Sequence, residues 1–179
     1  MAPCLVFSLA VLIPRRTALL QAALIHTAAQ AATPTQSILV DSNNKLKNLT
    51  PKQIADVVET DLKQNQFLVT GKLTRSIYAE TCTFKDEIDT YSLDKWITGT
   101  SALFDARKSY VELIGDVFAD ESQVRFRFQE VLCFNLPVLK PKVPLTGTLV
   151  LTRGADGLVE KYLEIWDTGV LQTISRAYL

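Results

Sequence analysis

The stretch that decides the fold is residues 109–134, which read SYVELIGDVFADESQVRFRFQEVLCF. Apolar and polar side chains alternate along both of its halves, and Asp120 and Glu121 separate the halves. Alternation is typical of a β-strand with one buried face, and a short polar break between two such runs is typical of a hairpin. The phase of the alternation slips near Glu130, which predicts a β-bulge there. This stretch therefore predicts an antiparallel hairpin that bends in its second strand.

Two further strand-like runs follow, over residues 145–153 and 157–167. Residues 154–157, GADG, supply a tight turn between them. Prolines at positions 137, 141 and 144 predict a longer extended excursion before the third run. The second half of the chain thus predicts a four-stranded antiparallel meander with one apolar face.

The chain before residue 109 has the period of amphipathic helices. Thr50 and Gln53 form a capping box at the start of a first helix, which ends near residue 65. A second, shorter helix is predicted over residues 70–79, and a third begins after Ser92 as its N-cap. Helices bury their apolar stripes against the one apolar face of the sheet. We therefore expect an α+β domain, a cone in which a curved antiparallel sheet wraps three N-terminal helices around a pocket.

Residues 1–31 contain no acidic side chain and have the layout of a targeting signal. Two adjacent arginines, at 15 and 16, precede a short apolar run, and residues 29–31, AQA, match a cleavage pattern. Paired arginines before a moderately apolar run are typical of twin-arginine signals, which follow a transit peptide on the way to the thylakoid lumen. We expect a cleavable presequence over 1–31, a flexible arm over 32–49 and the folded domain over 50–179. Stroma, mitochondrion and bacterial export are the alternatives to the chloroplast thylakoid lumen.

The composition excludes several classes of partner. The chain has 19 basic and 19 acidic residues, a balance that favours neither nucleic acid nor an anionic membrane. No apolar stretch of about 20 residues follows residue 40, so no integral membrane segment is expected in the mature chain. Cys82 and Cys133 lie among apolar neighbours, which favours two buried free thiols, with a disulfide as the alternative. No CxxC spacing is present, which excludes a zinc or thioredoxin-type site.

Residues 77–86, IYAETCTFKD, resemble a junction in the nuclear transport factor 2-like (SnoaL-like) superfamily, where a tyrosine, an acidic residue, a phenylalanine and an aspartate follow the second helix. The closing strand at 157–167 is the other matching feature, whereas Glu87 stands where the family has proline. The resemblance covers residues 51–168 and implies a cystatin-like cone of the kind found in SnoaL-type cyclases, ketosteroid isomerase and scytalone dehydratase. Residues 69–74, VTGKLT, resemble a poorly characterised plant, algal and cyanobacterial branch.

Proton-transfer chemistry in this chain has to rely on carboxylates. The only histidine, His26, lies in the predicted presequence, so the mature chain has no histidine base or histidine-ligated metal. We expect no metal and no cofactor. The carboxylate candidates are Asp86, Glu130 and Glu164, each with a structural alternative as a loop cap, a bulge residue or a cross-strand partner. Candidates for the lining of a pocket are Asp86 and the aromatic residues Tyr78, Phe84, Trp96, Phe128, Tyr162 and Trp166.

Four polar side chains alternate outward on neighbouring predicted strands: Arg125, Arg127, Thr146 and Thr148. They indicate a solvated sheet face, and the alternative is a docking or homodimer surface, since the resembling fold often pairs through its sheet. Two functions stay open. The missing histidine and the plain charge pattern favour a non-catalytic module of the lumen that binds a small apolar ligand or docks a protein partner. The alternative is a small isomerase, cyclase or dehydratase that uses a pocket carboxylate as its base.

Overall fold

A computed structural model of this chain describes residues 44–179. The predicted presequence lies outside the described residues, and so does most of the predicted arm. The elements are α1 (Pro51–Thr60), the π-helix η1 (Asp61–Asn65), α2 (Phe67–Thr70), the 3-10 helix η2 (Arg75–Ile77), β1 (Tyr78–Lys85), β2 (Thr90–Ser92), α3 (Leu93–Leu103), β3 (Tyr110–Ala119), β4 (Gln123–Cys133), β5 (Lys142–Arg153), β6 (Val159–Trp166) and α4 (Val170–Ser175). No helix within residues 44–179 is both long and apolar enough to span a membrane.

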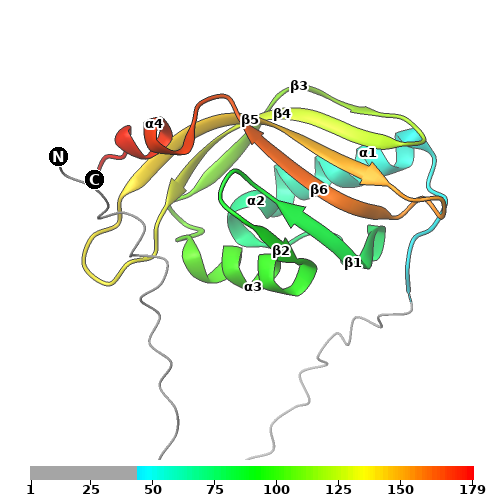
Figure 1. The fold of residues 1–179 in the computed structure, drawn as a ribbon, viewed down its shortest axis with the longest axis horizontal. Helices are drawn as coiled ribbons and strands as arrows, with labels where there is room; N and C mark the ends of the chain where they lie inside the picture. Colours follow the sequence, from blue (N-terminus) through cyan, green and yellow to red (C-terminus); the bar gives the residue numbers. More distant parts are fainter. Residues whose placement is uncertain (1–43) are drawn as a thin grey trace, which may run out of the picture. The chain divides into compact units, whose positions relative to one another are not determined.

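The six strands form one curved sheet in the order β2-β1-β6-β5-β4-β3, and α1, α2 and α3 lie on its concave side (Figure 1). The predicted four-stranded meander is present as β3 to β6, all in antiparallel pairs. The sheet is mixed, however, because β1 pairs in parallel with β6. The α+β class and the sheet wrapped around helices are as predicted from the sequence.

The first and third predicted helices are confirmed. Thr50 and Gln53 form the capping box of α1, and the side chain of Ser92 accepts the bond that caps α3. The second helix, predicted over 70–79, is wrong, because α2 ends at Thr70 with Gly71 as its C-cap, and β1 begins at Tyr78. Gly71 has φ +72°, a left-handed conformation that stops a helix and favours glycine.

The predicted bulge at Glu130 is also wrong. The register of β4 with β5 runs without a shift from Gln123 to Cys133, and the irregularity lies in β3, between Ile114 and Phe118. The apolar run at the end of β4 has another cause, which is that both faces of the sheet are covered there. Leu132 joins the core, whereas the thiol of Cys133 lies 3.7 Å from the carbonyl oxygen of Lys140, in the segment that follows β4.

Stacked aromatic rings fill the space between β1, β6 and α3. The ring of Phe84 lies 4.6 Å from that of Tyr162 and 4.8 Å from that of Trp96, centre to centre. Tyr78 stacks on the same phenylalanine at 5.6 Å. Aromatic pairs at these separations add to the free energy gained from burial. Cys82 is buried beside this stack in the core and, like Cys133, is a free thiol, so the disulfide alternative is wrong.

Candidate functional site

Two of the three predicted carboxylates lie together on the concave face of the sheet. Glu130 on β4 is paired with Leu145 on β5, and Glu164 on β6 is paired with Leu149 on β5. Both leucines belong to the hydrophobic core, and paired residues on neighbouring strands point to the same face. The strand register therefore directs both carboxyl groups toward the core, and we call Glu130 and Glu164 the inner carboxyls.

Glu164 is held by two donors from its own strand. The hydroxyl of Tyr162 donates to Oε2 at 2.6 Å, and Nε1 of Trp166 donates to Oε1 at 2.7 Å. Burial raises the pKa of Glu164, these two hydrogen bonds oppose the rise, and the charges of Asp86 and Glu87 add to it. Glu164 and Trp166 are half-buried, so this edge of the concave face reaches solvent.

Glu130 differs from Glu164 in having no donor for one of its oxygens. Its residue is 4% exposed, and Oε2 has no hydrogen-bond partner among the described residues. Burial first, and then the charge of Glu164, raise the pKa of Glu130 well above its usual range. The neutral acid, which can donate a hydrogen bond, is therefore favoured over a wider pH range than for an ordinary glutamate.

Asp86, the third candidate, serves the turn that follows β1. Its Oδ1 accepts hydrogen bonds from the backbone N–H groups of Ile88 and Asp89, both at 2.8 Å. This is the loop-capping role that the sequence offered as the structural alternative. Burial raises the pKa of Asp86, and burial together with the charges of Asp86, Asp89 and Glu164 raises the pKa of Tyr91 to about 12.

The aromatic residues predicted to line a pocket pack against one another instead. Tyr78, Phe84, Trp96, Phe128 and Tyr162 are all buried members of the core. Of the predicted set, only Asp86 and Trp166 keep part of their surface in contact with solvent. Two hollows among the described residues, of about 620 and 230 Å³, lie away from this stack. Neither is the interior pocket that the sequence predicted.

The smaller hollow lies on the outer face of the sheet, beside α4. It is bordered by Tyr110, Gln129, Val131, Pro144, Thr146 and Arg176, together with Glu130 and Leu145. Alternation along the strands aims the side chains of Glu130 and Leu145 at the opposite, concave face. At 230 Å³ the hollow is smaller than the roughly 300–1,000 Å³ typical of ligand pockets.

The predicted outer-face residues belong to a network around a residue that the sequence analysis missed, Asp167. Arg127 donates to both carboxylate oxygens of Asp167, at 3.2 and 2.7 Å, and Thr146 donates to Oδ2 at 2.7 Å. Thr148 lies 3.5 Å from the guanidinium of Arg127. Arg125 instead lies over the ring of Phe118. A homodimer through this face stays a prediction.

Comparisons with known proteins give likenesses to solved structures at low sequence identity. No protein-family model and no curated protein matches this sequence. An NTF2-like protein from Anabaena variabilis covers 63% of this chain and 88% of its own, at 17% identity and a TM-score of 0.48. AclR, a proposed hydroxylase from Streptomyces galilaeus, covers 63% and 90%, at 15% identity and a TM-score of 0.44.

The α+β class with a curved sheet around helices was predicted from the sequence and is confirmed. The nuclear transport factor 2-like superfamily and its plant, algal and cyanobacterial branch stay predictions. Within residues 44–179 no group of three or more histidine, cysteine, aspartate or glutamate side chains is arranged to hold a metal ion. The curved sheet brings the inner carboxyls to one face. Glu130 is the residue there whose hydrogen bonding is incomplete. It is the centre of the candidate site.

Proposed function

We propose that this chain is a non-catalytic module that binds a small, largely apolar molecule on the concave face of its sheet, with Glu130 as the polar anchor. The observation that carries the proposal is the buried, unpartnered Oε2 of Glu130. Buried polar atoms in proteins almost always have a hydrogen-bond partner, and an exception calls for water, an ion or a ligand. A ligand carbonyl or hydroxyl would supply that partner.

The surroundings of Glu130 suit an apolar ligand with one polar group. Its strand neighbours on the same face, Phe128 and Leu132, are both core residues. Binding sites for small molecules are mostly apolar, with a few placed polar groups that fix orientation. A neutral carboxyl group in such a setting donates a hydrogen bond without the cost of burying a charge.

The other two carboxyl groups are already engaged. Both oxygens of Glu164 accept side-chain hydrogen bonds, and Asp86 caps the β1–β2 turn. One free carboxyl group is enough to anchor a ligand. It provides no second acid or base to complete a proton relay, which is why a binding role is favoured over a catalytic one. The arginine pattern of residues 1–31 supports the further proposal that the module works in the thylakoid lumen.

The binding proposal can be tested with prodan, a neutral aromatic ketone whose fluorescence shifts to the blue in apolar surroundings. We expect saturable binding to the full chain. Glu130→Gln keeps a hydrogen-bond donor and should bind prodan within about threefold of wild type, whereas Glu130→Leu should bind about tenfold more weakly. Glu112→Leu, on the exposed face of β3, is the matched control and should leave binding unchanged. Equal binding by wild type and Glu130→Leu would contradict the proposal.

A proton-transfer enzyme of the isomerase type is the second candidate, and the raised pKa of Glu130 favours it. Such a base would take a proton from the carbon beside the carbonyl of a bound ketone. In deuterated water, prodan would then gain deuterium at that carbon, which NMR detects. A binding module gives exchange at the rate of buffer alone. Exchange that is faster with wild type, and lost in Glu130→Gln while binding is kept, would assign the enzyme instead.

A further inference from the structure

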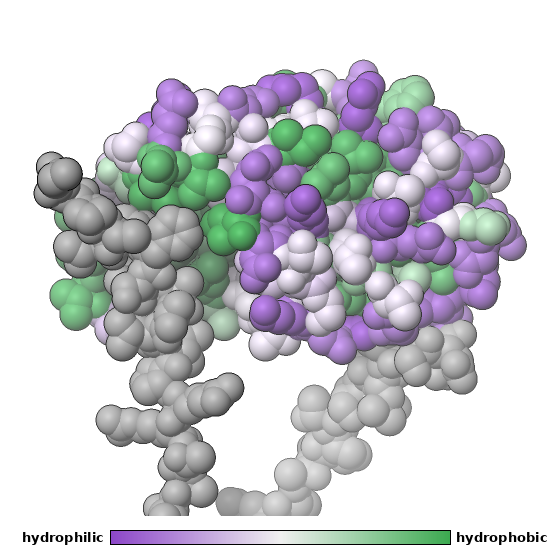
Figure 2. Space-filling view, viewed as in Figure 1, coloured by the Kyte–Doolittle hydropathy of each residue, from purple (hydrophilic) through white to green (hydrophobic). Residues whose placement is uncertain are grey.

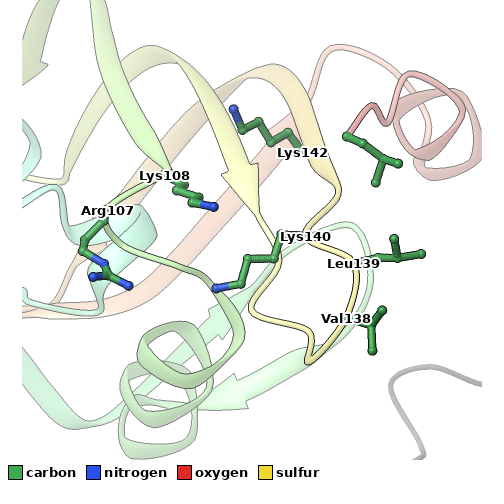
Figure 3. A pocket seen from close by; sticks show the side chains of 7 residues that line it. Arg107, Lys108, Val138, Leu139, Lys140 and Lys142 are labelled. Atoms are coloured by element: carbon green, nitrogen blue, oxygen red, sulfur yellow. The ribbon is translucent and has the colours of Figure 1, made fainter.

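The segment between β4 and β5, residues 134–141, forms a projecting loop beside the larger hollow. The hollow has a volume of about 620 Å³, and its lining combines four cations with three aliphatic residues: Arg107, Lys108, Lys140, Lys142, Val138, Leu139 and Leu179 (Figure 3). We call these seven residues the basic–apolar patch. Figure 3 shows Val138 and Leu139 pointing outward from the loop, whereas the ammonium group of Lys140 is directed toward Arg107 and Lys108.

Several contacts fix the base of the loop. The backbone N–H of Phe134 donates to the carbonyl of Pro141 at 3.0 Å, and that of Asn135 donates to the carbonyl of Leu103 at 2.8 Å. Nζ of Lys140 donates to Oδ2 of Asp105 at 2.8 Å. The ends of the loop are therefore tied to the sheet and to α3. The tip lies between these fixed ends and projects from them.

The tip of the loop is apolar and exposed. Val138 is 89% exposed, Leu139 is 56% exposed, and Leu179 beside them is 81% exposed. Single exposed aliphatic residues are common on protein surfaces, but a group of them around one hollow marks an interaction site. In the space-filling view, apolar surface is visible at the end of the molecule where this loop projects (Figures 1 and 2).

The side-chain charges of the basic–apolar patch have one sign. No acidic side chain lines the hollow, and Asp105, which pairs with Lys140 and lies 3.7 Å from Arg107, stands behind it. None of the ion pairs among residues 44–179 involves Lys108 or Lys142. The overall balance of 19 basic and 19 acidic residues conceals this local excess. The patch therefore attracts an anionic partner, although the whole chain does not.

We propose that the basic–apolar patch docks this domain onto the surface of an anionic lipid bilayer. Val138 and Leu139 would enter the boundary between headgroups and acyl chains, and the lysines would contact lipid phosphates. An acidic peptide would satisfy the cations, but it would leave Val138 without an apolar partner unless it also carried a matching pocket. A fluid bilayer receives projecting aliphatic side chains without a preformed pocket. The geometry therefore favours lipid over peptide.

Flotation of the full chain with lipid vesicles tests this proposal. We expect binding to phosphatidylcholine vesicles that contain about 30% phosphatidylglycerol, and much weaker binding to phosphatidylcholine alone. Salt at about 0.5 M should reduce the binding, because it screens the lysines. Lys108→Gln with Lys142→Gln should lower partitioning about twenty-fivefold, at roughly fivefold for each charge removed. Val138→Ser with Leu139→Ser should lower it about tenfold.

The matched control is Lys52→Gln with Lys63→Gln, which removes the same charge outside the patch and should change partitioning less than twofold. Every variant keeps residues 1–43, so any contribution from these residues cancels in the comparison. Equal binding to both kinds of vesicle, or equal loss in the control, would overturn the proposal. A third outcome would also overturn it: the protein binds a labelled glutamate-rich peptide through the patch but does not bind anionic vesicles. That result would assign a protein partner instead.

Discussion

The hydroxyl of Tyr162 donates a hydrogen bond of 2.6 Å to Oε2 of Glu164, two positions along the same strand. Side chains at this spacing share one face of a sheet, so the strand itself fixes the pair. Trp166, two positions further along, donates to the other oxygen. The pair therefore counteracts burial, which alone would raise the pKa of Glu164 further.

Tyr162→Phe should raise the pKa of Glu164, because it removes a donor that favours the charged form. The indole N–H resonance of Trp166, which reports on the same carboxyl group, is the probe to follow by NMR against pH. Its midpoint should move to higher pH in the variant, with a cost of about 1 kcal/mol in the free energy of unfolding. Tyr91→Phe is the control, since none of the hydrogen bonds to Glu164 comes from Tyr91. A midpoint that stays in place would contradict the role assigned to Tyr162.

Glu130 should make the protein less stable as pH rises. Its folded-state pKa is raised, so the native protein holds a proton that the unfolded chain releases. The stabilisation linked to that proton is complete below the unfolded-state pKa and is lost as pH rises through the folded-state pKa. Glu130→Gln cannot ionise, and at pH 8 it should be more stable than wild type by about 1–3 kcal/mol. The difference in the free energy of unfolding between Glu130→Gln and wild type should become smaller as the pH is lowered toward 5.

Urea denaturation at a series of pH values measures this difference. Glu112→Gln, on the exposed side of β3, is the control and should give an offset that does not change with pH. If Glu130→Gln and wild type lost stability in parallel between pH 5 and pH 8, Glu130 would not be the buried acid described above. A measured gain in stability would also support the binding proposal, since residues kept for ligand contacts are often suboptimal for folding.

The meander could be predicted because its signal is local. Burial of one face forces a period of two, and residues 109–134 show that period directly. The parallel pairing of β1 with β6 could not be predicted from local sequence, since it joins Tyr78 to Val159, about 80 residues further along the chain. Leu73 and Ile77 have helical spacing, whereas pairing with β6 and β2 makes the segment that starts at Tyr78 a strand. Tertiary context overrides local propensity there.

In the candidate site, too, the features set by local sequence could be predicted, and those set by contacts between distant segments could not. The shared face of Tyr162, Glu164 and Trp166 follows from their spacing of two along the strand. The capping role of Asp86 is the structural alternative that the sequence offered. The burial of Glu130 and its coupling to Glu164 depend on β5, which separates their strands. A strand that is covered on both faces loses its alternation, and in the sequence this loss has the same pattern as a slip of phase. The apolar run after Glu130 therefore led to the wrong prediction of a bulge.

Glu80 on β1 should stabilise the protein above acidic pH. The hydrogen bond from Arg75, and then that from Lys45, lower the pKa of Glu80 to about 2. A lowered folded-state pKa gives stability that is present above the unfolded-state pKa and is lost as pH falls through the folded-state value. Glu80→Gln should therefore cost about 1 kcal/mol at pH 7, a modest figure because the site is partly exposed.

Most of the cost of Glu80→Gln should be lost near pH 2, where wild-type Glu80 is itself about half protonated. Thermal unfolding at pH 7 and at low pH makes the comparison. Glu59→Gln removes a single exposed ion pair with Lys63 and should cost no more than about 0.5 kcal/mol. Equal costs for the two variants at pH 7 would mean that Lys45 and Arg75 do not act together on Glu80.

Gly71 and Gly99 should respond in opposite ways to alanine. Gly71 has φ +72°, and a Cβ there would lie 2.6 Å from the carbonyl oxygen of Ile97 on α3. Gly71→Ala should cost about 2–4 kcal/mol, since the left-handed conformation alone costs 1–2. Gly99 lies within α3 with no atom near its Cβ position, so Gly99→Ala should add about 1 kcal/mol through helix propensity. Chemical denaturation compares the two. A harmless Gly71→Ala would mean that α2 does not approach α3 this closely, and the helical packing beneath the inner carboxyls would then need a different arrangement.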